Sequence, residues 1–484
     1  MGATSDGTKS YSHLTPPNLL GKTGWSVSPV GFGGYRIHPQ LSDHRDALKL
    51  ALKSGCNLID TSANYGDGGS EKLIGEVLRE MTSAGEIKRE QIVVVSKAGY
   101  MQGENLKLAR QRKDRGIAYP EVVEFSEDCW HCISPDFLKD QITRSLQRLG
   151  LEQIDVLLLH NPEYFFKTGG DHAEYYRRIG AAMKYLETEV SGGRIQFFGV
   201  SSNTFPEPKE SEDFTSLDAV YEIASQVGAK HFAVVQFPFN LYEPEAAFEP
   251  NNDGKTVFET AEVRNLGMLI NRPLNAYYGN KLIRLAEFPS HPEKDVEEAL
   301  KNSFLDALQI ESEFPAKDVL PVRNVSWAHV LRHNFEKISD IEGFKNIVAH
   351  QIEPALEEVE PVLNVNPEHR AWFEEYRAAI ETLCSDLTDY LEEVTALLSK
   401  RIDKILEGAV PELHSSKTLS QKVIRVYRSI PGASSVLVGM RKAEYVRDAM
   451  TLAPPISPEH AMDALDAIQQ DIQEGAAEPH THET

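Results

Sequence analysis

The sequence predicts a (β/α)8 barrel with a large helical insertion after its seventh strand. Eight short apolar runs, rich in β-branched residues, alternate with amphipathic stretches along the 484 residues, and runs of this kind are typical of buried parallel strands. Polar residues directly follow several of the runs, as they do at the end of a barrel that carries active sites. A doubly wound nucleotide-binding sheet typically has a Gly-x-Gly-x-x-Gly turn after its first strand. The segment 31–36, G-F-G-G-Y-R, lacks this turn, so the barrel is favoured.

The predicted elements follow one another in a regular order. The strands lie near residues 30–34, 56–60, 92–97, 154–160, 195–202, 232–237, 267–272 and 435–440. The helices lie near residues 43–54, 70–82, 135–149, 173–191, 216–227, 256–265 and 418–429. Strands that are each followed by a helix favour a parallel barrel over other architectures.

Two intervals are longer than one connecting helix requires. The first runs from Lys97 to Ile154 and contains the polar stretch K-L-A-R-Q-R-K-D-R-G, which could form part of a lid. The second runs from Leu274 to about Lys417, and its segment 373–407 has helical periodicity over roughly ten turns. It could be a helical subdomain beside the site, a surface for a protein partner, or a helical pair packed on the barrel.

These patterns give the predicted domain limits. The barrel takes residues 18–279 together with 417–452, and the helical insertion takes 280–416. Residues 1–17 and 473–484 are polar and are expected to be flexible termini.

Composition argues against several classes of protein, namely nucleic-acid-binding, membrane, secreted and disulfide-rich proteins. A formal charge of −23 argues against electrostatic binding to nucleic acid or to an anionic membrane. No apolar run approaches the roughly 18–20 residues that span a bilayer, and the N-terminal region has no apolar stretch typical of a secretory signal. Four scattered cysteines do not make a disulfide framework. We therefore expect a cytoplasmic protein with no membrane or nucleic-acid partner.

Four residues at predicted strand ends carry the chemistry. Asp60 ends the second strand and Tyr65 follows it, Lys97 ends the third, and His160 ends the fourth. Carbonyl reduction by hydride needs a proton donor, and a nearby ammonium makes a phenol easier to deprotonate. Tyr65 could give that proton, Lys97 could lower its pKa, Asp60 could hold Lys97, and His160 could contact the substrate oxygen. Each also has a structural alternative, namely capping, packing or simple solvation.

The same residues lie in motifs that resemble the aldo-keto reductase family, over about 18–279 and 417–450. The segment L-L-G-K-T-G-W-S-V-S-P-V-G-F-G is similar to the family's N-terminal hairpin and first strand. The segment D-T-S-A-N-Y-G-D-G-G-S-E-K-L-I-G carries its Asp and Tyr at Asp60 and Tyr65, and its catalytic Lys and His match Lys97 and His160. The resemblance implies an NAD(P)-dependent (β/α)8 oxidoreductase.

The resemblance also implies residues that bind the cofactor. Ser202 and Asn203 in G-V-S-S-N, and Gln236 in V-V-Q-F-P-F-N-L, match positions that hold the nicotinamide carboxamide. Many relatives place an aromatic residue before Ser-Pro-Leu, where this chain has Asn271 and Arg272. Arg272 could instead reach the pyrophosphate.

At the adenosine end, the resemblance implies Gly439, Met440 and Arg441 as a phosphate site. The Arg and Asn of many NADP-preferring relatives are Tyr445 and Ala449 in this chain. The choice between NADP and NAD stays open, with NADPH slightly favoured by the family.

The segment C-W-H-C at 129–132 invites a redox or metal interpretation. A zinc site needs three or four ligands, and no second Cys/His pair lies close in the sequence. We expect loop packing here and no metal site, although Trp130 or His131 could touch the substrate.

The leading hypothesis is an NAD(P)-dependent oxidoreductase acting on the carbonyl of an aldehyde, ketone or sugar, or on the corresponding alcohol. The alternative is a catalytically weak barrel that senses nucleotide and binds a protein partner through residues 280–416. The substrate is not specified by the sequence, because pocket walls in such a barrel come from the loops after its strands.

Overall fold

The structure is a computed structural model that describes residues 2–11, 17–278, 281–338 and 340–477. Its chain forms two compact units, Met1–Leu274 with Leu406–Thr484, and Asn275–Ile405. The predicted domain limits stay predictions, and the predicted boundary at 279–280 lies outside the described residues. The same is true of positions 12–16 and 478–484 in the termini predicted to be flexible.

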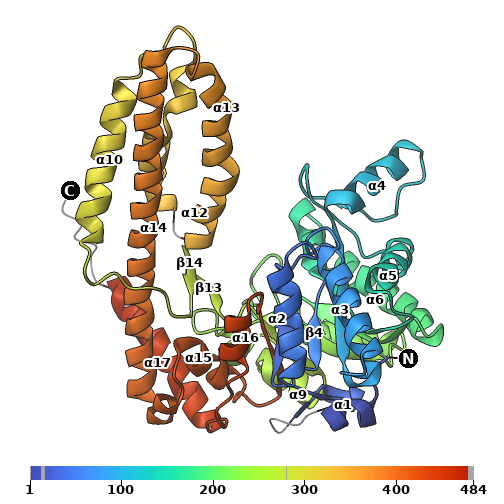
Figure 1. Cartoon of the computed structure of the whole chain (residues 1–484). Coiled ribbons are helices and arrows are strands. Elements are labelled where there is room, and N and C mark those ends of the chain that lie inside the picture. The colour runs from blue at the N-terminus through green and yellow to red at the C-terminus, as the bar shows by residue number, and fades with distance from the viewer. Residues whose placement is uncertain (1, 12–16, 279–280, 339, 478–484) are drawn as a thin grey trace. The chain divides into compact units, whose positions relative to one another are not determined.

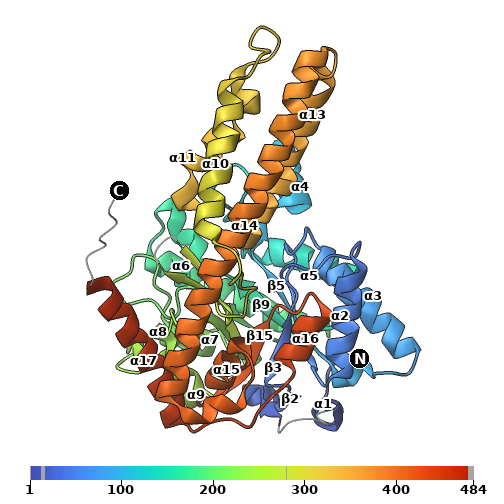
Figure 2. The same ribbon diagram turned by 60° about the vertical axis from the view of Figure 1, so that its left-hand side comes forward.

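The first unit contains a closed barrel of eight parallel strands (Figures 1 and 2). Around the barrel the order is β3-β4-β5-β9-β10-β11-β12-β15, which is the order of the sequence. Their bounds are β3 Val30–Gly33, β4 Leu58–Asp60, β5 Val93–Ala98, β9 Ile154–His160, β10 Ile195–Ser201, β11 Phe232–Pro238, β12 Gly267–Asn271 and β15 Ala433–Val438. The predicted (β/α)8 barrel is confirmed.

Helices connect and surround these strands. Their bounds are α1 Ser5–Tyr11, α2 Ser42–Lys53, α3 Gly69–Ser83, α4 Gly103–Asp114, α5 Pro135–Leu149, α6 His172–Ser191, α7 Leu217–Gln226, α8 Glu245–Phe248, α9 Val257–Val263, α15 Leu419–Tyr427, α16 Ala443–Ala449 and α17 Pro458–Ala477. α5 shows why the predicted bounds agree with the structure: Pro135 starts it, Phe137, Leu138 and Ile142 bury one face, and Gly150 ends it at φ +63°.

The long predicted interval between Lys97 and Ile154, which connects β5 to β9, has regular secondary structure. It contains α4 and a three-stranded antiparallel sheet of order β6-β8-β7, with bounds β6 Tyr100–Met101, β7 Val123–Glu124 and β8 Trp130–His131. An apolar cluster that includes Met101, Leu106, Trp130 and Phe137 of α5 packs this insertion.

The N-terminal segment packs into the same unit. A short hairpin, β1 Asn18–Leu19 with β2 Ser26–Val27, precedes the barrel, and Leu20 and Trp25 pack with the interior residues of the strands. Within the terminus predicted to be flexible, residues 5–11 form α1, and Ala3 N donates to the buried Asp155 Oδ1 at 2.6 Å. A buried backbone contact of this kind gives no periodic signal in the sequence.

The second unit is helical and has a core of its own. Its elements are β13 Asn275–Tyr278, β14 Lys281–Arg284, α10 Val296–Ser312, α11 Trp327–His333, α12 Ile341–Ile347, α13 Glu353–Leu363 and the N-terminal part of α14 Pro367–Ala409, which ends in the first unit. α10, α13 and α14 run alongside one another (Figures 1 and 2), and Phe314, Trp372 and Leu387 belong to one buried cluster. α14 contains the predicted helical segment 373–407.

None of the helices among the described residues is both long and apolar enough to cross a membrane. The predicted partner surface in the helical unit stays a prediction.

Candidate active site

The four polar residues predicted at strand ends lie together in the structure. Asp60 ends β4, Lys97 lies near the end of β5, His160 ends β9, and Tyr65 lies in the turn between β4 and α3. Lys97 Nζ donates to Asp60 Oδ2 at 2.7 Å and to the Tyr65 hydroxyl at 3.3 Å. The Tyr65 and His160 rings are edge to face, with centroids 5.9 Å apart. The arrangement follows from β4, β5 and β9 being neighbours in the barrel, so that their carboxyl ends meet.

The ion pair between Lys97 and Asp60 is buried and fully hydrogen-bonded. Lys97 is 0% exposed and Asp60 is 5% exposed. Lys97 also donates to the Thr61 carbonyl oxygen at 3.0 Å, and Asp60 Oδ1 accepts from Gln236 Nε2 at 2.8 Å. Such additional bonds are what keep a buried ion pair from destabilising a fold.

Burial sets the protonation states in this cluster. Burial raises the pKa of the Tyr65 phenol, and the positive charge of Lys97 opposes that rise without cancelling it. Burial alone would lower the pKa of Lys97, but Asp60 and Tyr65 raise it more, so the ammonium is kept. Burial, reinforced by Lys97, holds the pKa of His160 well below its usual range. The site therefore combines a neutral phenol, an ammonium and a neutral imidazole.

The residues expected at the nicotinamide end lie at the ends of adjacent strands. Ser202 directly follows β10, and its side chain is fully buried. Its backbone N–H donates to the backbone carbonyl oxygen of Gln236 at 3.0 Å. Asn203 comes next and is half-buried. The Gln236 amide is already engaged, because its Oε1 accepts from Ser201 Oγ at 3.2 Å while its Nε2 holds Asp60. The structure thus gives Gln236 a contact with the ion pair that the sequence did not predict.

Asn271 and Arg272, at the end of β12, differ in their surroundings. The Asn271 side-chain oxygen is buried and has no hydrogen-bond partner among the described residues. A buried acceptor of this kind fits a ligand that carries an amide N–H, such as a nicotinamide carboxamide. Arg272 has φ +55° and forms an ion pair with Glu243 at 3.2 Å. That pair competes with the predicted contact to a pyrophosphate.

The residues expected at the phosphate end follow β15. Gly439 is exposed, Met440 is buried, and Arg441 is half-buried. After the larger effect of burial, the charge of Arg441 contributes to lowering the pKa of His44 on α2, which places the guanidinium near that helix.

Several neighbours of the cluster were not singled out in the sequence. Tyr35 follows β3 and packs edge-on to Tyr65, with centroids 5.0 Å apart. Tyr100, just after β5, packs edge-on to His160 at 4.7 Å and to Tyr164 at 4.9 Å. All three tyrosines lie within a few residues after a barrel strand, Tyr100 in β6 and Tyr164 in the 3-10 turn Pro162–Thr168, and that position was the signal that could have identified them.

The C-W-H-C segment supplies no disulfide. Cys129 and Cys132 are free thiols, and burial raises the pKa of Cys132 to about 11. Trp130 is buried with the cations of Arg110 and Lys113 over its ring at 5.6 and 5.2 Å, so it faces α4. His131 is buried beside His160.

Glu163 is a buried carboxyl that the sequence did not mark. It lies in the 3-10 turn Pro162–Thr168 after β9, is 3% exposed, and accepts from the Asn203 backbone N–H at 2.9 Å. Burial raises its pKa to about 7, although the bond from Asn203 acts in the opposite direction.

This shift predicts a pH-dependent stability. Between the ordinary Glu pKa of about 4.3 and about 7, the folded chain binds one proton more than the unfolded chain. The free energy of unfolding should therefore fall as pH rises through this window, by on the order of 3 kcal/mol in total. Glu163→Gln keeps an acceptor for Asn203 and removes the titration, so its unfolding free energy should lack this fall.

Urea denaturation at pH 5, 6, 7 and 8 measures the difference between the parent and Glu163→Gln. A constant difference in unfolding free energy between the two proteins does not matter, because the titration of Glu163 is reported only by the slope of the unfolding free energy against pH. The exposed Glu210, whose side chain is 73% exposed, gives the matched control Glu210→Gln, which should run parallel to the parent. Parallel curves for Glu163→Gln and the parent would contradict the assignment.

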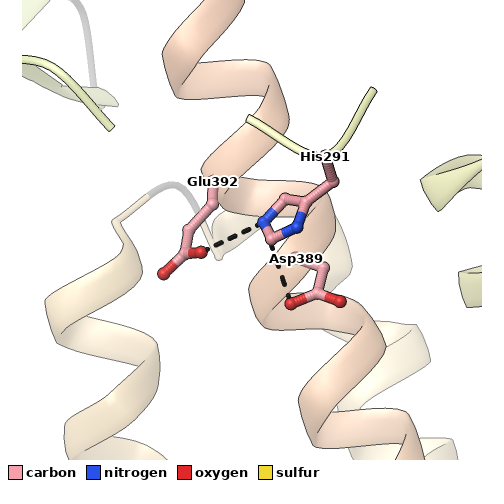
Figure 3. Close-up of side chains that lie close together, drawn as sticks. All are labelled: His291, Asp389 and Glu392. Carbon is pink, nitrogen blue, oxygen red and sulfur yellow. Dashed lines mark hydrogen bonds and ion pairs between the residues drawn. The ribbon is translucent and has the colours of Figure 1, made fainter. Parts of the chain in front are cut away.

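One polar cluster of the helical unit has the composition of a metal site (Figure 3). His291 Nε2 lies 3.2 Å from Glu392 Oε2 and 3.9 Å from Asp389 Oδ1, both on α14. Lysine side chains already neutralise these carboxylates, with Lys294 Nζ 2.6 Å from Asp389 and Lys345 Nζ 3.2 Å from Glu392. We therefore interpret the cluster as one that ties the segment before α10 to α14.

Comparison with known proteins identifies the family. The profile of the aldo/keto reductase family matches residues 29–336. An NADH-specific methylglyoxal reductase of Escherichia coli is 25% identical over 209 residues, which are 42% of this chain and 56% of that protein. A 6-dehydroglucose reductase of Novosphingobium aromaticivorans is 29% identical over 194 residues, 38% of this chain and 51% of that protein. The chain thus spans about half the length of these curated relatives.

Among solved structures, the glycerol dehydrogenase of Gluconobacter oxydans is 17% identical, with a TM-score of 0.48, and the match covers 98% of this chain and 99% of that one. The family profile covers more than half of this chain, and the matched residues include Asp60, Tyr65, Lys97 and His160. The chain belongs to the aldo/keto reductase family.

Proposed function

We propose that this protein is an NAD(P)H-dependent oxidoreductase that reduces the carbonyl of an aldehyde, ketone or sugar, with Tyr65 as the proton donor. One observation carries the proposal: Lys97 Nζ lies 2.7 Å from Asp60 and 3.3 Å from the Tyr65 hydroxyl. A buried ammonium beside a phenol has an evident use in proton transfer, whereas a strand-end lysine kept for solubility would lie in water.

The four residues divide the chemistry among them. The cofactor, when bound, supplies hydride to the carbonyl carbon. The Tyr65 hydroxyl hydrogen-bonds the carbonyl oxygen and gives it a proton as negative charge develops there. Lys97 stabilises the phenolate that remains, and Asp60 keeps Lys97 in place. The neutral His160 imidazole faces the same oxygen and accepts a hydrogen bond from it once it is protonated. In the direction of alcohol oxidation, the Tyr65 phenolate accepts the proton.

The proposed cofactor site uses the residues that follow the later barrel strands. Ser202, Asn203 and the unpartnered Asn271 oxygen suit a carboxamide, and Gln236 adjoins them through the Ser202 backbone. Arg272 is proposed for the pyrophosphate, which requires it to leave Glu243. Gly439, Met440 and Arg441 are proposed for the phosphate at the adenosine end. We propose NADPH as the preferred cofactor, on family resemblance, and the cytoplasm as the location, since four free cysteines suit a reducing compartment.

Titration with NADPH and with NADH, followed by protein fluorescence, tests cofactor binding. Oxidation of the preferred cofactor is then measured at 340 nm with a panel of aldehydes, ketones and sugars. We expect saturable binding and turnover with at least one class of carbonyl. Tight cofactor binding without turnover across the panel, or with the matching alcohols, would instead support the nucleotide-sensing alternative.

A further inference from the structure

The C-W-H-C segment lies directly against the active-site strands. The backbone N–H of Cys132 donates to the Gly99 oxygen at 2.8 Å, just after β5. Within the small sheet, His131 pairs with Tyr100 and Trp130 pairs with Met101. The segment is therefore anchored to the chain that leaves β5, two residues beyond Lys97.

His131 contacts the main chain of His160. Its Nε2 lies 2.7 Å from the His160 carbonyl oxygen. That oxygen only accepts, so Nε2 carries the hydrogen. Burial lowers the pKa of His131 to about 4, which keeps the imidazole neutral and leaves it this single donor. The Tyr164 ring stacks on His131 at 5.7 Å and 25° and holds its plane.

Gly99 makes this contact feasible. A Cβ at Gly99 would lie 2.4 Å from the His160 oxygen and 2.6 Å from His131 Nε2. Both distances are below any real contact of a Cβ atom. The absence of a side chain at this position therefore lets the two histidines approach each other.

A second connection reaches the imidazole of His160. Its Nδ1 lies 3.0 Å from Ser62 Oγ, and Ser62 Oγ lies 2.6 Å from Asn64 Oδ1. Asn64 Nδ2 lies 3.0 Å from Gln102 Oε1, and Gln102 also hydrogen-bonds the Cys129 thiol. Ser62 Oγ donates its one hydrogen to Asn64 Oδ1, and Asn64 Nδ2 donates to Gln102 Oε1. Ser62 Oγ therefore accepts from His160 Nδ1–H, which selects the tautomer of the neutral His160 ring whose Nε2 is free to accept.

We propose that the insertion between β5 and β9 is a positioning element for His160. His131 holds the main chain of His160, while the chain Ser62–Asn64–Gln102, which ends on Cys129, fixes the orientation and tautomer of its ring. This inference rests on the proposed function, because it concerns the geometry of His160 toward the substrate oxygen. It also accounts for the C-W-H-C segment without redox or metal chemistry.

The test compares variants that break each connection. Ser62→Ala removes the hydroxyl from His160 Nδ1. His131→Phe keeps an aromatic ring against Tyr164 and removes the donor, whereas His131→Gln retains an N–H near the position of Nε2. The matched control is Tyr119→Phe in the same insertion, because the Tyr119 hydroxyl contacts Asp140, on α5.

We expect kcat to fall by roughly 10- to 100-fold in Ser62→Ala and His131→Phe, because a catalytic group that is slightly misplaced, here His160, loses rate on this scale. His131→Gln should recover most of the loss, and Tyr119→Phe should match the parent. The cofactor dissociation constants, measured by fluorescence, should stay within about threefold, because the change affects the step at His160.

A Tyr65→Phe variant in the same assay separates the two proposals. If Tyr65→Phe is inactive while Ser62→Ala and His131→Phe keep the parent kcat, the positioning role is overturned and the proposed function stands. If Tyr65→Phe turns over like the parent, the proposed function itself fails. If His131→Phe does not fold, Ser62→Ala decides the outcome.

Discussion

Tyr65→Phe is expected to lower kcat by roughly 10²- to 10⁴-fold, the usual contribution of a general acid. The substitution removes the proposed proton donor and keeps the ring that packs against Tyr35 and His160. The cofactor dissociation constant should change little, because the residues proposed to hold the carboxamide lie on other strands. The measurement pairs steady-state turnover of the best carbonyl substrate with fluorescence titration of the cofactor.

A matched control keeps the interpretation specific. Tyr221, on α7, has the Arg264 guanidinium 4.6 Å from its ring centroid, and phenylalanine retains that contact. Tyr221→Phe should therefore retain parent turnover. Parent-like kcat in Tyr65→Phe would remove Tyr65 from the mechanism. A large loss of cofactor affinity without a change in kcat would assign it to binding instead.

The barrel was predictable because its strands are short, apolar and regularly spaced. The polar residues at their ends followed from the same periodicity, since a residue that ends a buried strand must leave the core. The long helix α14 was predictable from the helical periodicity of apolar residues in segment 373–407. α1 was missed because its contacts come from backbone groups, small side chains such as Thr8, and the single aromatic Tyr11, whose hydroxyl donates to the Leu52 backbone oxygen, and these contacts form no periodic pattern.

The sequence could not give the contacts that join distant segments. Ser62 and His160 are 98 residues apart, and His131 and His160 are 29 apart. No periodicity links such pairs, so the role of the C-W-H-C segment stayed open. The net direction of the pKa shift of Tyr65 could not be predicted from the sequence either. The lowering influence of Lys97 was predictable from charge, but the larger effect of burial depends on the neighbours that enclose the phenol.

The buried ion pair itself gives a second large effect. Lys97→Met should reduce the free energy of unfolding by about 3–5 kcal/mol, because a side chain of similar length replaces the ammonium and leaves Asp60 charged and buried. Turnover should also be lost, since no cation remains to stabilise the Tyr65 phenolate. Urea denaturation at pH 7 and steady-state kinetics measure the two effects.

The double variant Lys97→Met, Asp60→Asn separates stability from chemistry. The Asp60→Asn substitution removes the carboxylate charge and keeps an acceptor for Gln236, so most of the lost stability should return while turnover stays absent. Folding raises the pKa of Lys97, so its stabilising contribution is fully present below the ordinary lysine value of about 10.4 and is lost only as pH rises above it. The difference between parent and Lys97→Met should therefore be the same at pH 7 and pH 8. Recovery of turnover in the double variant would show that the reaction does not need the ammonium, and the proton donor would then have to work without the charge beside it.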